Sequence, residues 1–193
     1  NQVFNHLVQH LPALVMAMRA HIQPWLDQLV RLVLLRWNSR LKVHMLVLLE
    51  KLIRVLRHAL QGYMPRLMPL LTSLIESDHS PQRMPSLTAL GAIEAVGPDR
   101  VPYEGIVMPA IEMHLQHAAP GSHAVRAGLR ALTAISAWLT LHPSRFTPLL
   151  LNVLRESPAE SATIESIFVT MVCQLSSSWR TYHARVAHTL RCH

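Results

Sequence analysis

Glycine, cysteine and charged residues are scarce in this chain of 193 residues, and each shortage argues against a class of protein. The six glycines are scattered, which argues against a glycine-rich loop that cradles a nucleotide. The two cysteines, Cys173 and Cys192, are too few for a disulfide scaffold, and we expect both to be buried thiols. Apolar runs such as residues 32–35 are far shorter than the ~18–20 residues of a membrane span. Because 50% of the residues are hydrophobic and only 15% are charged, we expect a folded, intracellular protein.

The apolar residues recur three and four positions apart, which is typical of amphipathic helices. Between residues 43 and 60 they are Val43, Leu46, Val47, Leu49, Ile53, Leu56 and Leu60. No segment alternates with period two, so we predict an all-α protein. Breaks rich in proline and small polar residues separate the helices. Among them, Ser80–Pro81 and Ser157–Pro158 are predicted to be the N-cap and first residue of helices.

One aromatic position recurs near the start of every second helix, at intervals of roughly 40 residues. Its members are Trp25, Tyr63, Tyr103, Phe146 and Tyr182. We expect each ring to pack between neighbouring helical hairpins, where a large side chain buries the most surface. A two-helix repeat of this length predicts a HEAT-type α-solenoid of about five antiparallel helix pairs. The predicted units are residues 1–37, 38–78, 79–118, 119–157 and 158–193.

Both ends of the sequence are apolar where a terminal capping repeat would be polar. Phe4, Leu7 and Val8 lie near the start, and Val186 and Leu190 lie near the end. The first residues also lack an initiator methionine and the pattern of a signal peptide. These features predict that the chain is a fragment of a much longer solenoid.

Six short sequence blocks are informative when their order and spacing are considered together. They are H-I-Q-P-W-L-D at 21–27, W-N at 37–38, Y-M-P-R-L-M-P at 63–69, D-H-S-P-Q-R at 78–83, V-M-P-A-I at 107–111 and M-V-C-Q-L at 171–175. In order and spacing they resemble blocks in the HEAT solenoid of the target of rapamycin (TOR) kinases. The similarity covers approximately residues 7–190. The chain departs from the family at 40–57, which is more basic here, and at 101–104, where the family has a longer run containing aspartate.

The resemblance implies a function that the residue pattern alone does not. TOR kinases are very large serine/threonine kinases of the phosphatidylinositol-3-kinase-related class, with a HEAT solenoid ahead of the kinase domain. That solenoid carries accessory subunits such as Raptor or Rictor and helps to form a dimer. By resemblance, this chain is a non-catalytic scaffold segment in nutrient and growth signalling. Its implied partners are Raptor- or Rictor-like subunits and a second copy of the kinase. Its implied location is cytoplasmic, peripheral on endomembranes through the parent complex.

The residues themselves predict no catalytic and no cofactor-binding site in this segment. Phosphoryl transfer needs a lysine for the phosphates and aspartates for the metal ion and the reacting hydroxyl. The only lysines, Lys42 and Lys51, lie inside a helical pattern. The aspartates Asp27, Asp78 and Asp99 lie far apart in the sequence and have no acidic partner at helical spacing.

Histidine is the residue type that most suggests metal binding, since the chain has 13. Pairs that would share a helix face are His6 with His10, His114 with His117, and His188 with Cys192. A zinc site needs three or four ligands and supporting hydrogen bonds. No CxxC pair or His-Glu-x-x-His motif supplies them, so we predict no metal site.

Positive charge is concentrated in one stretch of a chain whose formal net charge is +7. Its arginines are Arg31, Arg36, Arg40, Arg54 and Arg57, and we predict that they contact a partner or a neighbouring subunit. A nucleic-acid binder usually adds aromatic stacking residues, and only Trp37 lies in this stretch, so no nucleic-acid partner is expected. Two alternatives stay open, namely a HEAT-repeat transport or adaptor protein and a basic HEAT nucleic-acid binder.

Overall fold

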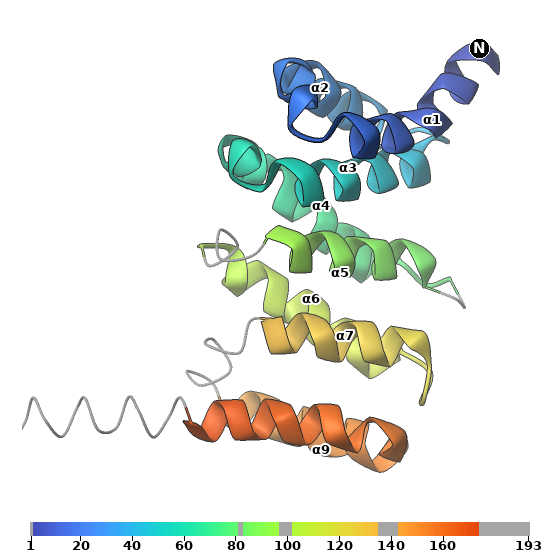
Figure 1. Cartoon of the computed structure of the whole chain (residues 1–193). Helices are drawn as coiled ribbons and strands as arrows, with labels where there is room; N and C mark the ends of the chain where they lie inside the picture. The colour runs from blue at the N-terminus through green and yellow to red at the C-terminus, as the bar shows by residue number, and fades with distance from the viewer. Residues whose placement is uncertain (1, 81–82, 97–101, 135–142, 174–193) are drawn as a thin grey trace, which may run out of the picture.

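The structure, a computed structural model, describes residues 2–80, 83–96, 102–134 and 143–173. Within these ranges helices and short turns account for the backbone, and none of it is strand. The helices are stacked one above another along a single axis (Figure 1). The all-α fold of stacked helix pairs predicted from the sequence is therefore confirmed. None of the helices in the described ranges combines the length and the apolar character that crossing a membrane requires.

Within the described residues, each of the first four predicted units contains two α-helices, and 3-10 turns (η) join several of them. The elements are α1 (Gln2–Met18), η1 (Arg19–Trp25), α2 (Leu26–Arg36), α3 (Lys42–Leu56), η2 (Arg57–Tyr63), α4 (Met64–Ser77), α5 (Met84–Val96), α6 (Glu104–His117), α7 (His123–Ala134), α9 (Pro143–Glu156) and η4 (Pro158–Glu160). The described part of the chain then ends in a helix at residues 161–173. Tyr182 and the rest of the fifth predicted unit beyond residue 173 lie outside the described residues.

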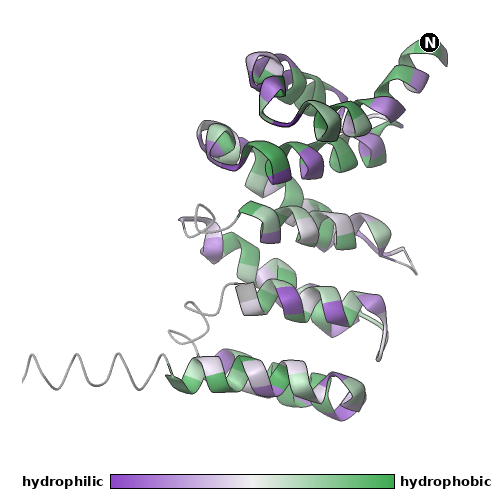
Figure 2. Ribbon diagram, in the orientation of Figure 1, coloured by the Kyte–Doolittle hydropathy of each residue, from purple (hydrophilic) through white to green (hydrophobic). Residues whose placement is uncertain are grey.

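The helices form two rows with an apolar core between them. In the first row α3 packs on α1 and α5, and α5 packs on α7. In the second row α4 packs on α6, and α9 contacts α6. Between the rows α4 packs on α5, and α6 packs on α7. Apolar and polar residues alternate around each helix (Figure 2), so that side chains such as Met45, Leu52 and Leu71 are completely buried.

The recurring aromatic residues mark the same backbone position in three units. Trp25, Tyr63 and Tyr103 are the N-cap residues of α2, α4 and α6, with φ of −100°, −98° and −109°. Their ψ angles are 6°, −15° and 1°, so the three residues share nearly the same backbone conformation. Phe146 differs because it lies inside α9, in its first turn. The sequence repeat therefore corresponds to a repeat of backbone conformation.

A second conformational marker repeats at the same interval. Arg19 and Arg57 each begin a 3-10 turn six residues before the aromatic N-cap. Both have positive φ, 49° and 27°, which is uncommon for a residue with a side chain. The first two units are therefore related by a shift of 38 positions, from Arg19 to Arg57 and from Trp25 to Tyr63.

The prediction that every recurring ring packs in the core is right for one residue and wrong for another. Phe146 is completely buried, and Tyr63 and Tyr103 are partly buried against the core. Trp25 is 46% exposed, which contradicts the prediction. Trp25 belongs to the unit that ends the described stack, so its ring has a neighbouring hairpin on one side only.

Helices α6 and α7 approach each other closely at Gly128. A Cβ atom at this position would lie 2.6 Å from Leu115 Cδ2 and 2.9 Å from Leu115 Cγ. Because Leu115 is buried, we expect Gly128→Ala to lower the free energy of unfolding by about 1–2 kcal/mol, despite the higher helix propensity of alanine. Urea unfolding measures this change. Gly105→Ala is the control, since no atom lies within 4 Å of its added Cβ, and equal effects of both substitutions would contradict the close approach.

Candidate functional site

Around the turn between α4 and α5 lies a group of polar side chains, the Asp78 cluster, made up of Asp78, Ser80, Arg83, Ser86 and His114, of which all but Ser80 are buried. Asp78 Oδ1 accepts hydrogen bonds from the Ser80 amide at 3.0 Å and the Ser80 hydroxyl at 2.6 Å. Asp78 Oδ2 accepts from the Ser86 amide at 3.0 Å and the Ser86 hydroxyl at 2.7 Å. The two carboxylate oxygens therefore accept hydrogen bonds from the turn and from the first turn of α5.

Asp78 acts as the N-terminal cap of α5 from a position well before the helix. Ser86 is the third residue of α5, and its amide would have no partner inside the helix. The predicted cap, Ser80, is wrong because α5 begins at Met84, and the Ser80 carbonyl instead accepts a bond from the Arg83 amide at 3.1 Å. Arg83 has φ of 48°, a turn that the sequence pattern does not reveal.

The second predicted cap, Ser157, occupies the N-cap position, but its side chain does not form the capping hydrogen bond. It immediately precedes η4. Its hydroxyl instead accepts a hydrogen bond from the Gly121 amide at 2.8 Å, in the turn between α6 and α7. Gly121 has φ of 68°, a conformation that glycine adopts without strain. Ser157 therefore joins two turns of the stack.

Arg83 connects the ends of two helices that lie far apart in sequence. Its side chain is buried, and Nε and Nη2 donate to the Asp78 carbonyl at 3.3 and 2.9 Å. Its Nη1 donates to the His114 carbonyl at 2.9 Å, in the last turn of α6. A cation that donates to carbonyls at helix C-termini also interacts favourably with the helix dipoles. The guanidinium is thus held by backbone carbonyls at the ends of α4 and α6.

His114 extends the cluster to α7. Its ring is completely buried, and Nε2 lies 3.0 Å from the Ala124 carbonyl. Since a carbonyl only accepts, Nε2 carries the proton and donates, while Nδ1 is a buried nitrogen without a hydrogen-bond partner. Burial lowers the pKa of His114, the charge of Arg83 lowers it further, and the bond to Ala124 and the Asp78 charge oppose the change only in part. The ring is therefore neutral near pH 7.

The lowered pKa of His114 predicts a loss of stability in mild acid. The unfolded chain takes up the proton at its ordinary pKa of 6.5, whereas the folded chain takes it up only at lower pH. The free energy of unfolding should therefore fall as the pH drops below 6.5, by at most about 1.4 kcal/mol per pH unit for this group. Urea titrations from pH 8 to pH 5 should show a shallower fall in His114→Gln. His117→Gln, at an exposed histidine, should keep the wild-type slope, and identical slopes in all three proteins would contradict the assignment.

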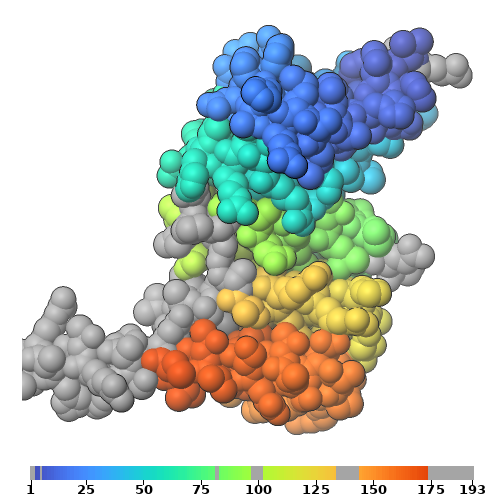
Figure 3. All heavy atoms as spheres, viewed as in Figure 1, coloured from blue at the N-terminus to red at the C-terminus, as the bar shows by residue number. Residues whose placement is uncertain are grey.

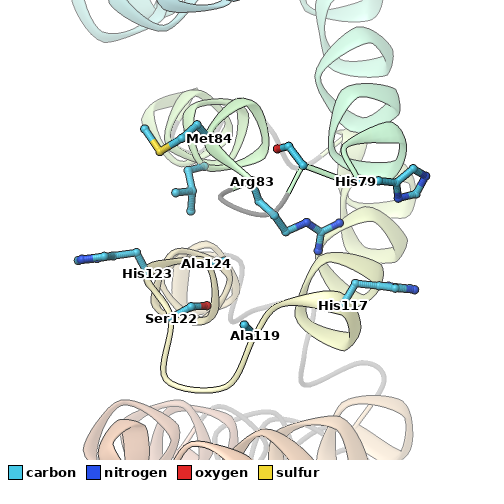
Figure 4. A pocket seen from close by; sticks show the side chains of 10 residues that line it. His79, Arg83, Met84, His117, Ala119, Ser122, His123 and Ala124 are labelled. Atoms are coloured by element: carbon cyan, nitrogen blue, oxygen red, sulfur yellow. The ribbon is translucent and has the colours of Figure 1, made fainter.

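A groove of about 550 Å³ lies beside the Asp78 cluster, between the starts of α5 and α7 and the end of α6. Arg83 reaches into this space, and Met84 and Leu87 line its α5 side (Figure 4). Three histidines border the groove, but His123 points to the opposite side from His79 and His117 (Figure 4). The three imidazoles therefore do not converge on one point in the groove.

The histidine pairs singled out by spacing have separate roles. The His6 and His10 rings contact each other edge to face, with centroids 4.6 Å apart. His114 is buried as described, whereas His117 is exposed and its Nδ1 lies 2.8 Å from the Met113 carbonyl. His188 and Cys192 lie outside the described residues. In the described ranges no three histidine, cysteine, aspartate or glutamate side chains are grouped so that they could hold a metal ion.

Cys173 corrects a further expectation from the sequence. We predicted a buried thiol, but Cys173 is exposed. It lies near the end of the helix at residues 161–173, on a turn that also exposes Val172. A place in a helical apolar pattern therefore does not ensure that a side chain is buried. Cys192 lies outside the described residues.

The five predicted partner-binding arginines are all exposed, but they are spread over the second and third helices of the chain. Arg31 and Arg36 lie on α2, and Arg40 lies in the following turn. Arg54 lies near the end of α3, and Arg57 begins η2. Since α3 has 15 residues, Arg40 and Arg57 are separated by about 22 Å along the helix. Their role in binding a partner stays a prediction.

Two of these arginines also contact residues of this chain. Arg36 stacks over the Phe4 ring at 5.2 Å, and Arg54 Nε donates to Glu50 Oε1 at 2.8 Å. Arg31 and Arg40 form no ion pair with any residue in the described ranges. Arg31 and Arg40 therefore offer the more accessible positive charge for a partner.

No protein-family model matches this sequence. The role of the Asp78 cluster must therefore follow from its geometry. Asp78 and His114 have displaced pKa values, yet both direct their hydrogen bonds to serines or to the backbone of neighbouring helices. The cluster joins α4, α5, α6 and α7 and presents neither an acid nor a base to a substrate. We interpret it as a structural joint between the units.

Proposed function

We propose that this chain is a non-catalytic scaffold segment of a TOR-like serine/threonine kinase. In this proposal its exposed helix faces bind Raptor- or Rictor-like subunits or a second copy of the kinase. The chain itself takes part in no phosphoryl transfer and serves to hold partners at fixed positions along the stack.

The observation that carries the proposal is the location of the sequence blocks that resemble the TOR solenoid. The blocks at 21–27 and 63–69 both span the junction between a 3-10 turn and the following α-helix. The block at 78–83 supplies Asp78, Ser80 and Arg83 of the buried joint. Residues shared with a family in the turns of a repeat support a shared repeat geometry. Turns require particular backbone conformations and hydrogen bonds, which few residue types satisfy.

A solenoid of this kind supports a binding role for a physical reason. Each unit contacts mainly its neighbours, so the stack leaves a long exposed surface while the core stays intact. The exposed arginines on α2 and in the turn after it lie on this surface. Electrostatic attraction from such residues acts mostly on the rate and specificity of association.

Affinity purification of the protein from its own cells, followed by mass spectrometry and a kinase assay, tests the proposal. We expect Raptor- or Rictor-like subunits to co-purify together with serine/threonine kinase activity. Recovery of transport cargo without kinase activity would contradict the proposal and favour the adaptor alternative. Recovery of nucleic acid, with binding that weakens steeply as salt rises, would favour the nucleic-acid alternative.

Charge reversal at Arg31 and Arg40 is expected to reduce partner recovery without unfolding the protein. Neither residue is paired with a described acid, so the Arg31→Glu and Arg40→Glu double variant should keep its melting temperature within about 2 °C. We expect at least a tenfold loss of co-purified subunit, measured by quantitative mass spectrometry. Arg155→Glu on α9 is the control and should leave recovery unchanged. Unchanged recovery in the double variant would remove these arginines from the contact.

A further inference from the structure

The groove beside the Asp78 cluster is bordered by three helix ends in the middle of the stack. The starts of α5 and α7 and the end of α6 line its volume of about 550 Å³. A volume of this size accommodates several side chains of a ligand. In the space-filling view the layers of α5 and α7 lie between those of α3 and α9 (Figure 3). A further repeat at either end of the described stack would therefore not cover the groove.

Arg83 brings a buried positive charge to the groove without a carboxylate beside it. A guanidinium has five N–H donors, and Arg83 uses three of them, all for the carbonyls of Asp78 and His114. Its other N–H groups have no acceptor in the described ranges, and no acid described there forms an ion pair with it. The side chain is 5% exposed and reaches into the groove (Figure 4). Its charge is therefore one that a bound anion can neutralise.

The first turn of α7, on another side of the groove, also lacks an anionic partner. The first N–H groups of a helix have no acceptor inside it, and α7 has no acidic residue in its first turn. The amides of His123 and Ala124 have no acceptor in the described part of the chain. The Val125 amide reaches the Ser122 hydroxyl only at 3.4 Å, which is longer than the usual distance of about 2.9–3.0 Å. None of the described residues that line the groove is acidic.

The start of α5 shows what a carboxylate does at such a place. A shift of 39 positions relates the start of α5 at Met84 to the start of α7 at His123. The same shift relates Asp78, which caps α5 through the Ser86 amide, to His117. Helix α7 therefore has no carboxylate at the position from which α5 is capped. A carboxylate supplied by another molecule would give α7 the cap that Asp78 gives α5.

We infer that this groove is a docking site for an acidic segment of a partner protein. A glutamate or aspartate side chain of the segment accepts hydrogen bonds from Arg83 and from the first turn of α7. Apolar neighbours of that acid pack on Met84, which is 56% exposed, and on Leu87. The formal net charge of +7 favours such a partner over a second copy of the chain. The inference rests on the geometry and charge of the groove and does not depend on the proposed kinase scaffold.

Titration of the intact, isotope-labelled chain with a peptide, followed by NMR spectroscopy, tests the inference. The probe is a peptide of repeated Leu-Asp-Glu units, which presents a carboxylate in every register, and a peptide of Leu-Asn-Gln units is its neutral control. At about 0.15 M salt, where distant charges are screened, we expect saturable shifts of the His123 and Ala124 amide signals with a Kd in the micromolar range. The neutral peptide should bind at least tenfold more weakly. Equal binding of both peptides, no saturable shift, or shifts confined to α2 and α3 would overturn the inference.

Two variants that change the net charge equally locate the binding surface. Ser122→Asp places a carboxylate immediately before α7, where the Ser122 hydroxyl already faces the Val125 amide. It should weaken binding of the acidic peptide at least tenfold without lowering the melting temperature, because aspartate is a favourable N-cap. Gln28→Glu, at an exposed residue of α2, is the control and should bind the peptide as the wild type does. Wild-type binding by Ser122→Asp, or an equal loss in both variants, would overturn the assignment.

Discussion

Replacement of Asp78 by alanine is expected to lower the free energy of unfolding by about 3 kcal/mol. The buried carboxylate accepts four hydrogen bonds, two from Ser80 and two from Ser86. Without it, α5 loses its cap at a cost of about 1 kcal/mol, and buried donors of Ser86 lose their partner at about 1–3 kcal/mol. Urea unfolding at pH 7 measures the change.

Asp27→Ala is the matched control for this prediction. Asp27 is exposed in the first turn of α2, so its loss should cost less than about 1 kcal/mol through the helix dipole. A similar cost for both substitutions would show that Asp78 is not a buried joint.

Acid should remove the stabilisation that the Asp78 carboxylate gives the wild-type protein. Burial raises the pKa of Asp78, but the hydrogen bonds from Ser80 and Ser86 outweigh this effect and hold it below 3.8. The stabilisation is therefore complete above that pH and is lost as the pH falls through the folded-state pKa. The Asp78→Ala protein should lack this step in a comparison of unfolding free energies below pH 5.

Phe146→Ala is expected to lower the free energy of unfolding by about 3–5 kcal/mol. The ring is completely buried in the core, and its removal leaves a cavity that the surrounding helices fill only in part. In a stacked fold the loss should also destabilise the neighbouring units. Thermal unfolding followed by circular dichroism measures the effect.

Comparing the stability loss of Phe146→Ala with that of Trp25→Ala tests whether the recurring aromatic residue has the same structural role in both units. Trp25 is 46% exposed, so its truncation should cost less than about 1.5 kcal/mol. Equally large losses of stability at both positions would mean that the Trp25 ring is covered in solution. That result would contradict its exposure at the end of the described stack.

The helical fold was predictable because its signals are local. Apolar spacing and the recurring aromatic position depend on neighbouring residues in the chain, and such patterns indicate helices. The exposure of Trp25 was not predictable in this way. It depends on whether a further hairpin lies above the ring, and nothing near Trp25 in the sequence carries that information.

The Asp78 cluster was only partly predictable for the same reason. The D-H-S-P-Q-R block pointed to a structured turn, but the partners of its residues lie far along the chain. Arg83 bonds to the carbonyl of His114, 31 positions away. His114 was singled out for its spacing from His117, and that spacing did not reveal its burial or its bond to Ala124. The five arginines predicted to bind a partner are exposed, their role stays a prediction, and their spread over α2, the following turn, α3 and η2 followed only from the structure.

Hydrogen–deuterium exchange of the wild-type protein and Asp78→Ala tests most directly whether the cluster is a joint between units. The amide of Ser86 donates to Asp78, and His114 joins the start of α7 to α6. We predict faster exchange in the first turns of α5 and α7 of the variant, with α1 unchanged, because a lost contact in a solenoid is felt mainly by adjacent units. Unchanged exchange at Ser86, or equal acceleration throughout α1, would contradict this account.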